Sequence, residues 1–167
     1  MKSVGALAPS SKYLVSKMLK QIDFSKKVNI LELGPGTGVV TKEILDKITS
    51  DSNLVCLELN AQFCTDLEEI KDKNLQVIQG SAEDVGALFK NKSFDYVISG
   101  LPLAIFKKES VNEILDGCVA SLKEEGTYIQ FQYSLASKKT LQRYFTKVDL
   151  SLAAVNLPPA VVYTCSL

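Results

Sequence analysis

Three glycines at alternate positions form the part of this sequence best suited to chemistry. Gly34, Gly36 and Gly38 follow the mostly apolar run V-N-I-L-E-L, and a helical pattern begins soon after them. Glycine adopts backbone conformations that other residues avoid, and it lets a ligand lie directly against the main chain at the positive end of a helix. The spacing therefore predicts a strand, a ligand-binding loop and a helix, in that order.

Two glutamates are placed to contact a ligand held by this loop. Glu32 lies two residues before Gly34, and Glu58 lies near the end of the next apolar run. A carboxylate at the end of a second strand can accept hydrogen bonds from both hydroxyls of a ribose. A carboxylate just before the glycines suits a cationic group better than a pyrophosphate. Together they indicate a nucleoside ligand that carries positive charge.

Several other kinds of site are not expected. A dinucleotide-binding loop needs a third glycine where this chain has Val39, and no G-x-x-x-x-G-K-[ST] phosphate loop occurs. The chain has no histidine and no C-x-x-C spacing, so we expect no metal site. Its four cysteines are expected to be buried, reduced thiols: Cys56, Cys64, Cys118 and Cys165.

Length and charge limit the kind of protein this is. The chain has 167 residues, of which 46% are hydrophobic, and this fits one globular domain with a substantial core. Its formal net charge is zero, so no general attraction for nucleic acid is expected. No apolar run has the length of a membrane span, and Pro9 and Lys12 interrupt the apolar residues at the start. We therefore expect a cytosolic protein.

Strand and helix patterns alternate along the chain. Strands are expected at 28–33, 54–59, 75–79, 94–99, 127–133, 147–155 and 161–166. Helices are expected at 41–48, 61–70, 109–122 and 138–145, with a further short helical piece that runs through Phe89. Gly126 is expected to cap the helix 109–122. Such alternation with apolar strands predicts a mostly parallel sheet with helices on both faces. Ligands of such sheets bind beyond the carboxyl ends of the strands.

The first 22 residues form a basic amphipathic segment. They contain four lysines and no acidic residue, and their apolar residues recur at helical spacing after Ser10 or Ser11 as N-cap. One interpretation is a helix whose apolar stripe docks on the domain. The other is a lid over the glycine loop that also touches an anionic membrane surface. The two interpretations are compatible.

The run E-x-G-P-G-T-G, together with Glu58, resembles motif I and the second acidic position of the class I S-adenosylmethionine-dependent methyltransferases. The resemblance covers essentially the whole chain, so 1–167 is expected to be one methyltransferase domain with 1–22 as its N-terminal lid helix region. It implies S-adenosylmethionine as cofactor and a Rossmann-like seven-stranded sheet whose last strand is antiparallel. It also implies a set of cofactor-binding residues: Glu32, Gly34, Gly36, Gly38, Glu58, Ala82, Glu83 and Ser99. Many relatives have aspartate where this chain has Ser81.

The residues after the fourth strand bear on the substrate. Enzymes that methylate amines of nucleic acid bases usually have an amide and an aromatic ring here, and the ring stacks on a flipped base. This chain has S-G-L-P-L at 99–103 instead. Its first 45 residues look similar to the rRNA adenine dimethylases, but no counterpart of their C-terminal helical domain follows 161–166. We therefore expect no nucleic acid partner.

Five separated blocks look like the compact bacterial phospholipid N-methyltransferases. They are G-A-L-A-P-S-S-K-Y-L, L-E-L-G-P-G-T-G-V, S-G-L-P-L, Q-F-Q-Y and N-L-P-P-A-V-V, in the same order. The resemblance implies stepwise methylation of phosphatidylethanolamine toward phosphatidylcholine by a cytoplasmic enzyme peripheral at the inner face of the membrane. Members commonly have Thr-Tyr-Gly where this chain has Gln132, Tyr133 and Ser134 after Phe131.

Methyl transfer to an amine needs alignment and exclusion of water more than covalent chemistry. A proton must leave the ammonium, either to water or through a tyrosine or carboxylate near the site. Tyr13, Glu109 and Tyr133 are the candidates for the second route, and Tyr13 could instead close over the cofactor. Leu101, Pro102 and Arg143 are the candidate substrate-binding residues, and Arg143 or Tyr133 could meet a lipid phosphate.

Two other functions remain open from the sequence. One is methylation of an RNA adenine or a small soluble amine, and the other is a membrane-associated cofactor-binding module without activity. No stable protein partner is inferred.

Overall fold

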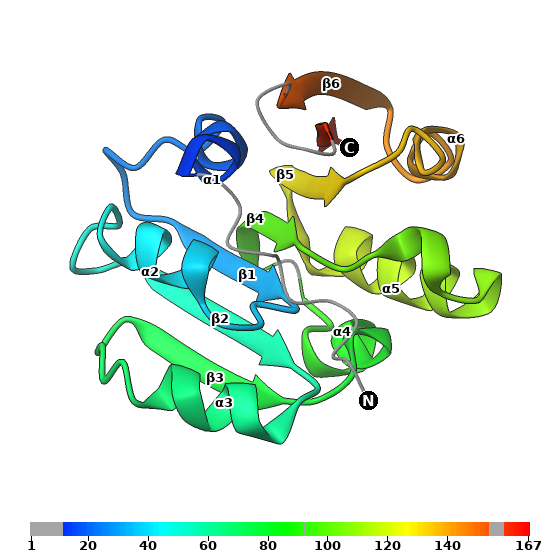
Figure 1. Ribbon diagram of the computed structural model, residues 1–167. Coiled ribbons are helices and arrows are strands. Elements are labelled where there is room, and N and C mark those ends of the chain that lie inside the picture. Colours follow the sequence, from blue (N-terminus) through cyan, green and yellow to red (C-terminus); the bar gives the residue numbers. More distant parts are fainter. Residues whose placement is uncertain (1–11, 92, 154–158) are drawn as a thin grey trace.

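The computed structural model describes residues 12–91, 93–153 and 159–167. Its centre is a seven-stranded sheet in the order β3-β2-β1-β4-β5-β7-β6 (Figure 1). The strands are β1 (Asn29–Leu33), β2 (Asn53–Glu58), β3 (Leu75–Gln79), β4 (Phe94–Ser99), β5 (Leu122–Gln132), β6 (Lys147–Ala153) and β7 (Ala160–Ser166). The helices are α1 (Lys12–Leu19), α2 (Val39–Leu45), α3 (Ala61–Glu68), α4 (Val85–Leu88), α5 (Lys108–Ser121) and α6 (Lys138–Leu141), with 3-10 turns η1 (Ala82–Asp84) and η2 (Leu103–Ile105).

The strand directions confirm the predicted sheet. β3, β2, β1, β4 and β5 pair in parallel, whereas β7 lies antiparallel between β5 and β6. The five parallel strands all end at the same edge of the sheet, which therefore gathers the residues that follow each of them.

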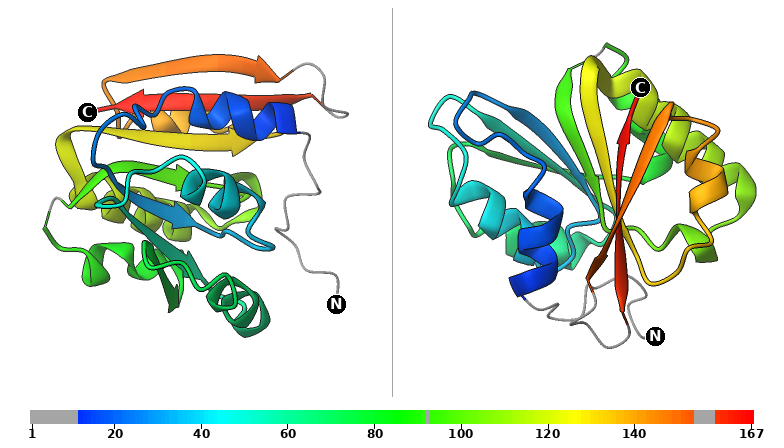
Figure 2. Two further views of the ribbon diagram at one scale, coloured as in Figure 1. Left: turned by 90° about the vertical axis from the view of Figure 1, so that its left-hand side faces the viewer. Right: turned by 90° about the horizontal axis from the view of Figure 1, so that it is seen from above.

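Helices cover both faces of the sheet. Figure 2 shows α1, α2 and α3 on one side and α4, α5 and α6 on the other. Each side has its own apolar core: Ile30, Ile98 and Ile129 of the strands pack with α1 and α2, and Leu31 and Tyr128 pack with α4, α5 and α6. This alternation along the strands follows from their two-residue period.

The prediction that Gly126 ends the preceding helix is wrong. α5 ends at Ser121, and Leu122–Gln132 is one strand that contains Gly126. The pairing of β4 with β5 shifts register between Phe94 and Tyr96, so the strand is irregular here. A Cβ at Gly126 would lie 2.8 Å from Leu122 Cδ2 and 2.9 Å from the Lys123 carbonyl oxygen. Glycine is therefore needed for a close backbone approach inside a strand, not for a helix cap.

α1 is docked on the sheet. Leu14, Val15, Met18 and Leu19 are buried, and the helix packs against α2 and against β5, β6 and β7. Lys17 Nζ donates a hydrogen bond to the Leu152 carbonyl of β6, which ties α1 to the edge strand. The expected N-cap and the rest of the lid region, 1–11, lie outside the described residues, as does most of the expected connection 156–159.

Candidate active site

The glycine loop joins β1 to α2 at the carboxyl edge of the sheet. Gly34 and Gly38 have φ angles of 66° and 78°, which other residues rarely adopt. A Cβ at Gly34 would lie 2.7 Å from Leu101 Cδ2, and one at Gly38 would lie 2.8 Å from Leu67 Cδ2. The loop thus needs glycine both for its backbone conformation and for the close approach of two leucines.

Glu58 is fixed beside this loop by two backbone amides. Its Oε2 accepts a hydrogen bond from Gly36 N at 3.0 Å, and its Oε1 accepts one from Asn60 N at 2.8 Å. The side chain is buried. The structure therefore holds the carboxylate at the end of β2 against the middle glycine of the loop, beside the place where the sequence led us to expect a ligand.

Glu32 lies deeper, with 3% of its surface exposed. Its Oε2 accepts hydrogen bonds from Thr41 Oγ1 at 2.7 Å and from Cys56 Sγ at 3.4 Å. Burial raises the pKa of Glu32 to about 7; the two hydrogen bonds oppose this rise, and the nearby Glu58 adds to it. A carboxyl with this pKa changes its charge readily near neutral pH, and a cation placed beside it would favour the charged form.

The segment after β3 forms a short turn. Ser81 Oγ accepts a hydrogen bond from Glu83 N at 3.2 Å and so caps η1. Ala82 is partly buried against the core, and Glu83 is exposed. Ser81 therefore shapes the turn that presents Ala82 and Glu83 at the sheet edge.

Buried amides hold the loop after β4. Ser99 is fully buried, and its Oγ accepts a hydrogen bond from Leu101 N at 3.3 Å. The Leu101 carbonyl accepts hydrogen bonds from Gln130 Nε2 and from Gln132 Nε2, both at 2.9 Å. Tyr128 OH donates to Gln130 Oε1 behind them. The two glutamine side chains thus fix the Leu101 backbone, while the Leu101 side chain lies against Gly34.

Sequence reasoning missed the role of these two glutamines. Gln130 and Gln132 are two residues apart on β5, so their side chains point to the same face of the sheet. Two amides at the end of an otherwise apolar buried strand are a signal, because buried polar groups need partners. The sequence does not say which backbone group they meet. Thr41, the partner of Glu32, was also missed.

The remaining predicted residues, Tyr133, Tyr13 and Arg143, lie outside the loop after β4. Tyr133 follows β5 directly, is exposed, and packs edge-on against Phe131 with ring centroids 4.8 Å apart. Tyr13 is exposed on α1 beside Lys17, whose Nζ lies 5.4 Å from the ring centroid. Arg143 lies after α6 and lines a cavity with Leu103. Of the two tyrosines, Tyr133 is next in sequence to a residue that holds the Leu101 carbonyl.

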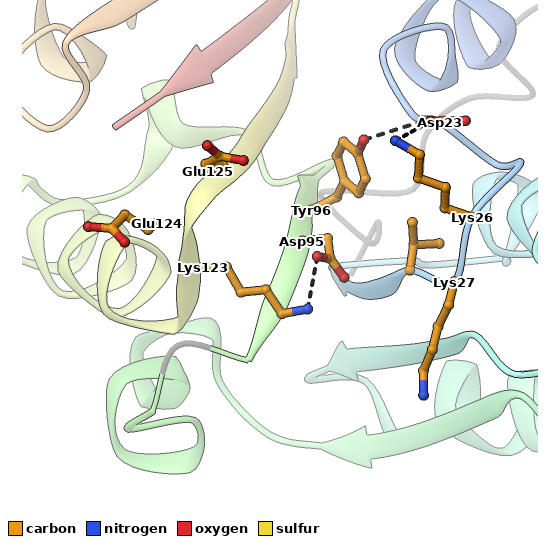
Figure 3. A pocket seen from close by; sticks show the side chains of 9 residues that line it. Asp23, Lys26, Lys27, Asp95, Tyr96, Lys123, Glu124 and Glu125 are labelled. Atoms are coloured by element: carbon orange, nitrogen blue, oxygen red, sulfur yellow. Dashed lines mark hydrogen bonds and ion pairs between the residues drawn. The ribbon is translucent and has the colours of Figure 1, made fainter.

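A different cavity lies at the opposite edge of the sheet, near the starts of β1, β4 and β5. It measures about 430 Å³ and mixes lysines with carboxylates. Figure 3 shows Lys123 pointing to Asp95 and Lys26 pointing to Asp23, at 2.9 Å and 3.2 Å. Lys26 and Lys123 each pair with an aspartate, and the cavity lies at the starts of the strands, away from the glycine loop at their carboxyl ends. We therefore assign the cofactor to the carboxyl edge and not to this cavity.

Three observations concern other classes of site. Within residues 12–91, 93–153 and 159–167, no group of three or more potential ligands is placed to hold a metal ion. No helix of this described part combines the length and apolarity needed to cross a membrane. All four cysteines are buried free thiols, as predicted, and burial raises the pKa of Cys165 to about 12.

Comparison with known proteins agrees with this geometry. The family described as "Methyltransferase domain" matches residues 30–126, which run from β1 into β5. The chain belongs to this methyltransferase family. It is a class I S-adenosylmethionine-dependent methyltransferase, and the matched span contains the glycine loop, Glu58 and the loop after β4.

Two kinds of relative differ in the share of their own length that matches this methyltransferase. It is 30% identical to the ornithine lipid N-methyltransferase of Singulisphaera acidiphila, over 98% of this chain and 88% of that protein. It is 26% identical to the ribosomal RNA small subunit methyltransferase A of Mycoplasma capricolum, over 67% of this chain and 45% of that protein. The chain thus spans about half the length of the ribosomal RNA enzyme.

Solved structures show the same fold. A SAM-dependent methyltransferase from Aquifex aeolicus superposes with a TM-score of 0.69 over 92% of this chain and 89% of that chain, at 10% identity. At this identity the likeness shows the fold alone.

The residues at the carboxyl edge fit S-adenosylmethionine. The bare main chain of Gly34–Gly38 leaves room for a ligand against the backbone, Glu58 offers a fixed carboxylate for ribose hydroxyls, and Glu32 offers a carboxyl that a cation would ionise. The cofactor supplies an electrophilic methyl group on a sulfonium. This chain's own task is to hold the acceptor in line and exclude water.

The amides under Leu101 give a first prediction. Replacing Gln132 with leucine removes one of the two donors to the Leu101 carbonyl and leaves the glycine loop intact. We expect kcat to fall by about 10-fold, because a small displacement of an acceptor loop costs rate, while the Kd for S-adenosylmethionine stays within about twofold. Gln130→Leu serves as the comparison variant. It leaves the buried Tyr128 hydroxyl without its hydrogen-bond acceptor and should lower the free energy of unfolding by about 1–3 kcal/mol. Equal kcat in Gln132→Leu and wild type would contradict this role.

Proposed function

We propose that this enzyme transfers methyl groups from S-adenosylmethionine to the amine of a membrane lipid headgroup, with phosphatidylethanolamine converted stepwise toward phosphatidylcholine. The observation that carries the proposal is the nearly full-length match to a protein named for N-methylation of a lipid, ornithine lipid N-methyltransferase. The ribosomal RNA relatives match less of this chain and less than half of their own length.

The loop after β4 supports a lipid amine over a nucleic acid base. Ser99–Leu103 supplies no side-chain amide and no aromatic ring for a flipped base. What the loop does present is a backbone held by two buried glutamines, beside a leucine that covers the first glycine of the cofactor loop. This supports the proposal that Leu101 and Pro102 orient an aliphatic amine, and we keep both, together with Arg143, as the substrate-binding residues.

Tyr133 is the candidate to relay to water the proton that the ammonium must lose, by passing on its own hydroxyl proton as it accepts the new one. It follows Gln132 directly and is exposed at the carboxyl edge of the sheet. Glu109 lies in the first turn of α5, and Tyr13 lies on α1 with its ring beside Lys17. Of the three, Tyr133 adjoins the loop after β4 that the glutamines hold. We therefore assign it the transfer of this proton and assign Tyr13 to the lid region.

Labelling of vesicles tests the proposal. The enzyme is incubated with S-adenosylmethionine labelled in its methyl group and with vesicles of phosphatidylethanolamine in phosphatidylcholine. We expect label in the lipid extract, at a rate that rises with the phosphatidylethanolamine fraction. Unlabelled lipid from a folded enzyme that binds the cofactor in calorimetry would refute the proposal, and label in RNA or in a soluble amine would replace it with the corresponding alternative.

A further inference from the structure

A cavity of about 480 Å³ lies next to the loop after β4, between η2, the start of α5 and the segment around α6. Figures 1 and 2 show α5 and α6 on the same side of the sheet. Leu103 lines the cavity and follows Pro102 directly, so the cavity adjoins the proposed acceptor loop. Its lining also includes Phe106, Lys108, Asn112, Ser137, Thr140 and Arg143.

The charge of this cavity has one sign. Lys108 and Arg143 line it, and its lining includes no carboxylate. Within the described ranges, neither cation takes part in the ion pairs, which join Lys26, Lys123 and Lys147 to aspartates. The cavity at the opposite edge and the one beside α1 instead mix lysines with carboxylates. Two cations that line one cavity without a carboxylate in its lining favour an anion.

Neutral donors complete the lining. Asn112 Oδ1 accepts a hydrogen bond from Tyr144 OH at 2.9 Å, so the amide nitrogen of Asn112 is left to donate. Ser137 and Thr140 add hydroxyls. Arginine binds phosphate or carboxylate through two parallel hydrogen bonds, and lysine acts as a point charge. The lining therefore suits an oxyanion.

Apolar side chains surround the cavity. Phe106 lines it and is 36% exposed, while Ile105 and Leu135, each next in sequence to a lining residue, are 64% and 60% exposed. Exposed apolar residues beside a basic cavity suit the boundary between headgroups and acyl chains of a bilayer.

We infer that this cavity binds the anionic group of the lipid headgroup, a phosphodiester or a carboxylate, and so holds the headgroup amine at the loop Ser99–Leu103. The inference rests on the proposed function. A short carbon chain joins the amine to the anionic group in such headgroups. A site for the anionic group beside the acceptor loop therefore positions the amine without an amide or aromatic ring on the loop itself.

The test compares two double variants of the full chain. Lys108→Gln with Arg143→Gln removes both cations of the cavity. Lys107→Gln with Lys139→Gln removes the same charge from exposed lysines nearby that do not line it. KM and kcat are measured for phosphatidylethanolamine in phosphatidylcholine vesicles, and vesicle cosedimentation is measured alongside.

We expect the cavity variant to raise KM about 10-fold or more with kcat within about threefold, because hydrogen bonds between charged groups are lost, and the control variant to stay within about twofold in both. Both variants should cosediment equally with vesicles and keep the wild-type Kd for S-adenosylmethionine. Equal KM values in the two variants would overturn the inference. Arg143→Lys keeps the charge but not the paired hydrogen bonds, and its intermediate KM provides a second test that does not depend on the double variant.

Three acceptors separate the sources of the anion. Phosphatidylethanolamine carries a phosphodiester, ornithine lipid carries a carboxylate, and stearylamine carries neither. On stearylamine the KM of the cavity variant should equal that of wild type. The lipid on which the variant's KM rises most identifies the anionic group that the cavity binds. A similar KM increase on stearylamine would overturn the inference while leaving lipid methylation intact. A wild-type enzyme inactive on all three lipids would instead refute the proposed function itself.

Discussion

Replacing Glu58 with alanine should weaken S-adenosylmethionine binding about 100-fold or more, as measured by isothermal titration calorimetry. The carboxylate is held by Gly36 N and Asn60 N at 3.0 and 2.8 Å, in the position expected for ribose recognition. Alanine removes both the hydrogen-bond acceptor for the ribose hydroxyls and the hydrogen bond that holds Gly36 of the glycine loop. Hydrogen bonds to a charged group contribute about 1.5–3 kcal/mol each, so the loss of two exceeds 100-fold.

A cofactor analogue sharpens this test. S-adenosylmethionine without its ribose 2′-hydroxyl should bind wild type more weakly but should bind Glu58→Ala as the normal cofactor does. Glu68→Ala, which removes an exposed carboxylate from the neighbouring α3, should bind the cofactor within about twofold of wild type. A Glu58→Ala variant with wild-type affinity would place the ribose elsewhere.

Replacing Glu32 with glutamine should stabilise the cofactor-free protein above pH 7 and leave its stability nearly unchanged at pH 4. The pKa of Glu32 is raised from 4.5 to about 7, mainly by burial. The folded state therefore holds a proton between these values that the unfolded state releases, so stability falls as pH rises from about 4.5 to about 7 and is fully reduced above that. The difference corresponds to about 3 kcal/mol.

Thermal unfolding across pH measures this effect. At pH 8 the Tm of Glu32→Gln should exceed that of wild type by about 6–12 °C, and the two should converge toward pH 4. Glu113→Gln, an exposed change on α5, should track wild type throughout. A difference in Tm that does not depend on pH would show that the Glu32 carboxyl is not the titrating group.

The same carboxyl links cofactor binding to pH. If it faces the cationic amino acid part of the cofactor, binding favours its charged form, so the affinity of wild type should increase as pH rises through about 7. Glu32→Gln should bind more weakly and lose this pH dependence.

The sequence predicted the sheet because its strands are short apolar runs separated by helical patterns. Each strand found in the structure overlaps a predicted strand, although β5 begins at Leu122 and not at Thr127, and the antiparallel placement of β7 followed from the family resemblance. Gly126 was misread because a glycine after a helical pattern usually ends a helix, and only the irregular pairing of β4 with β5 and the close approach of Leu122 and Lys123 show why glycine is needed here.

Part of the candidate site could likewise be predicted from local sequence patterns, and part could not. Gly34, Gly36, Gly38 and Glu58 were predictable because a glycine loop and a strand end are local features, and in the structure Gly36 N donates a hydrogen bond to the Glu58 carboxylate. The contacts of Gln130 and Gln132 with Leu101 join residues about thirty positions apart, so no local pattern states them. Lys108 escaped notice for the same reason, since only the packing around α5 and α6 places it beside Arg143.

One competition experiment tests the central claim most directly. The enzyme receives methyl-labelled S-adenosylmethionine together with vesicles containing phosphatidylethanolamine and ornithine lipid, and with RNA in the same tube, and the products are identified by mass spectrometry. Lipid N-methylation predicts new methyl groups on a headgroup nitrogen and unlabelled RNA. Methylated adenine in the RNA with unmodified lipids, from enzyme that binds its cofactor, would contradict it.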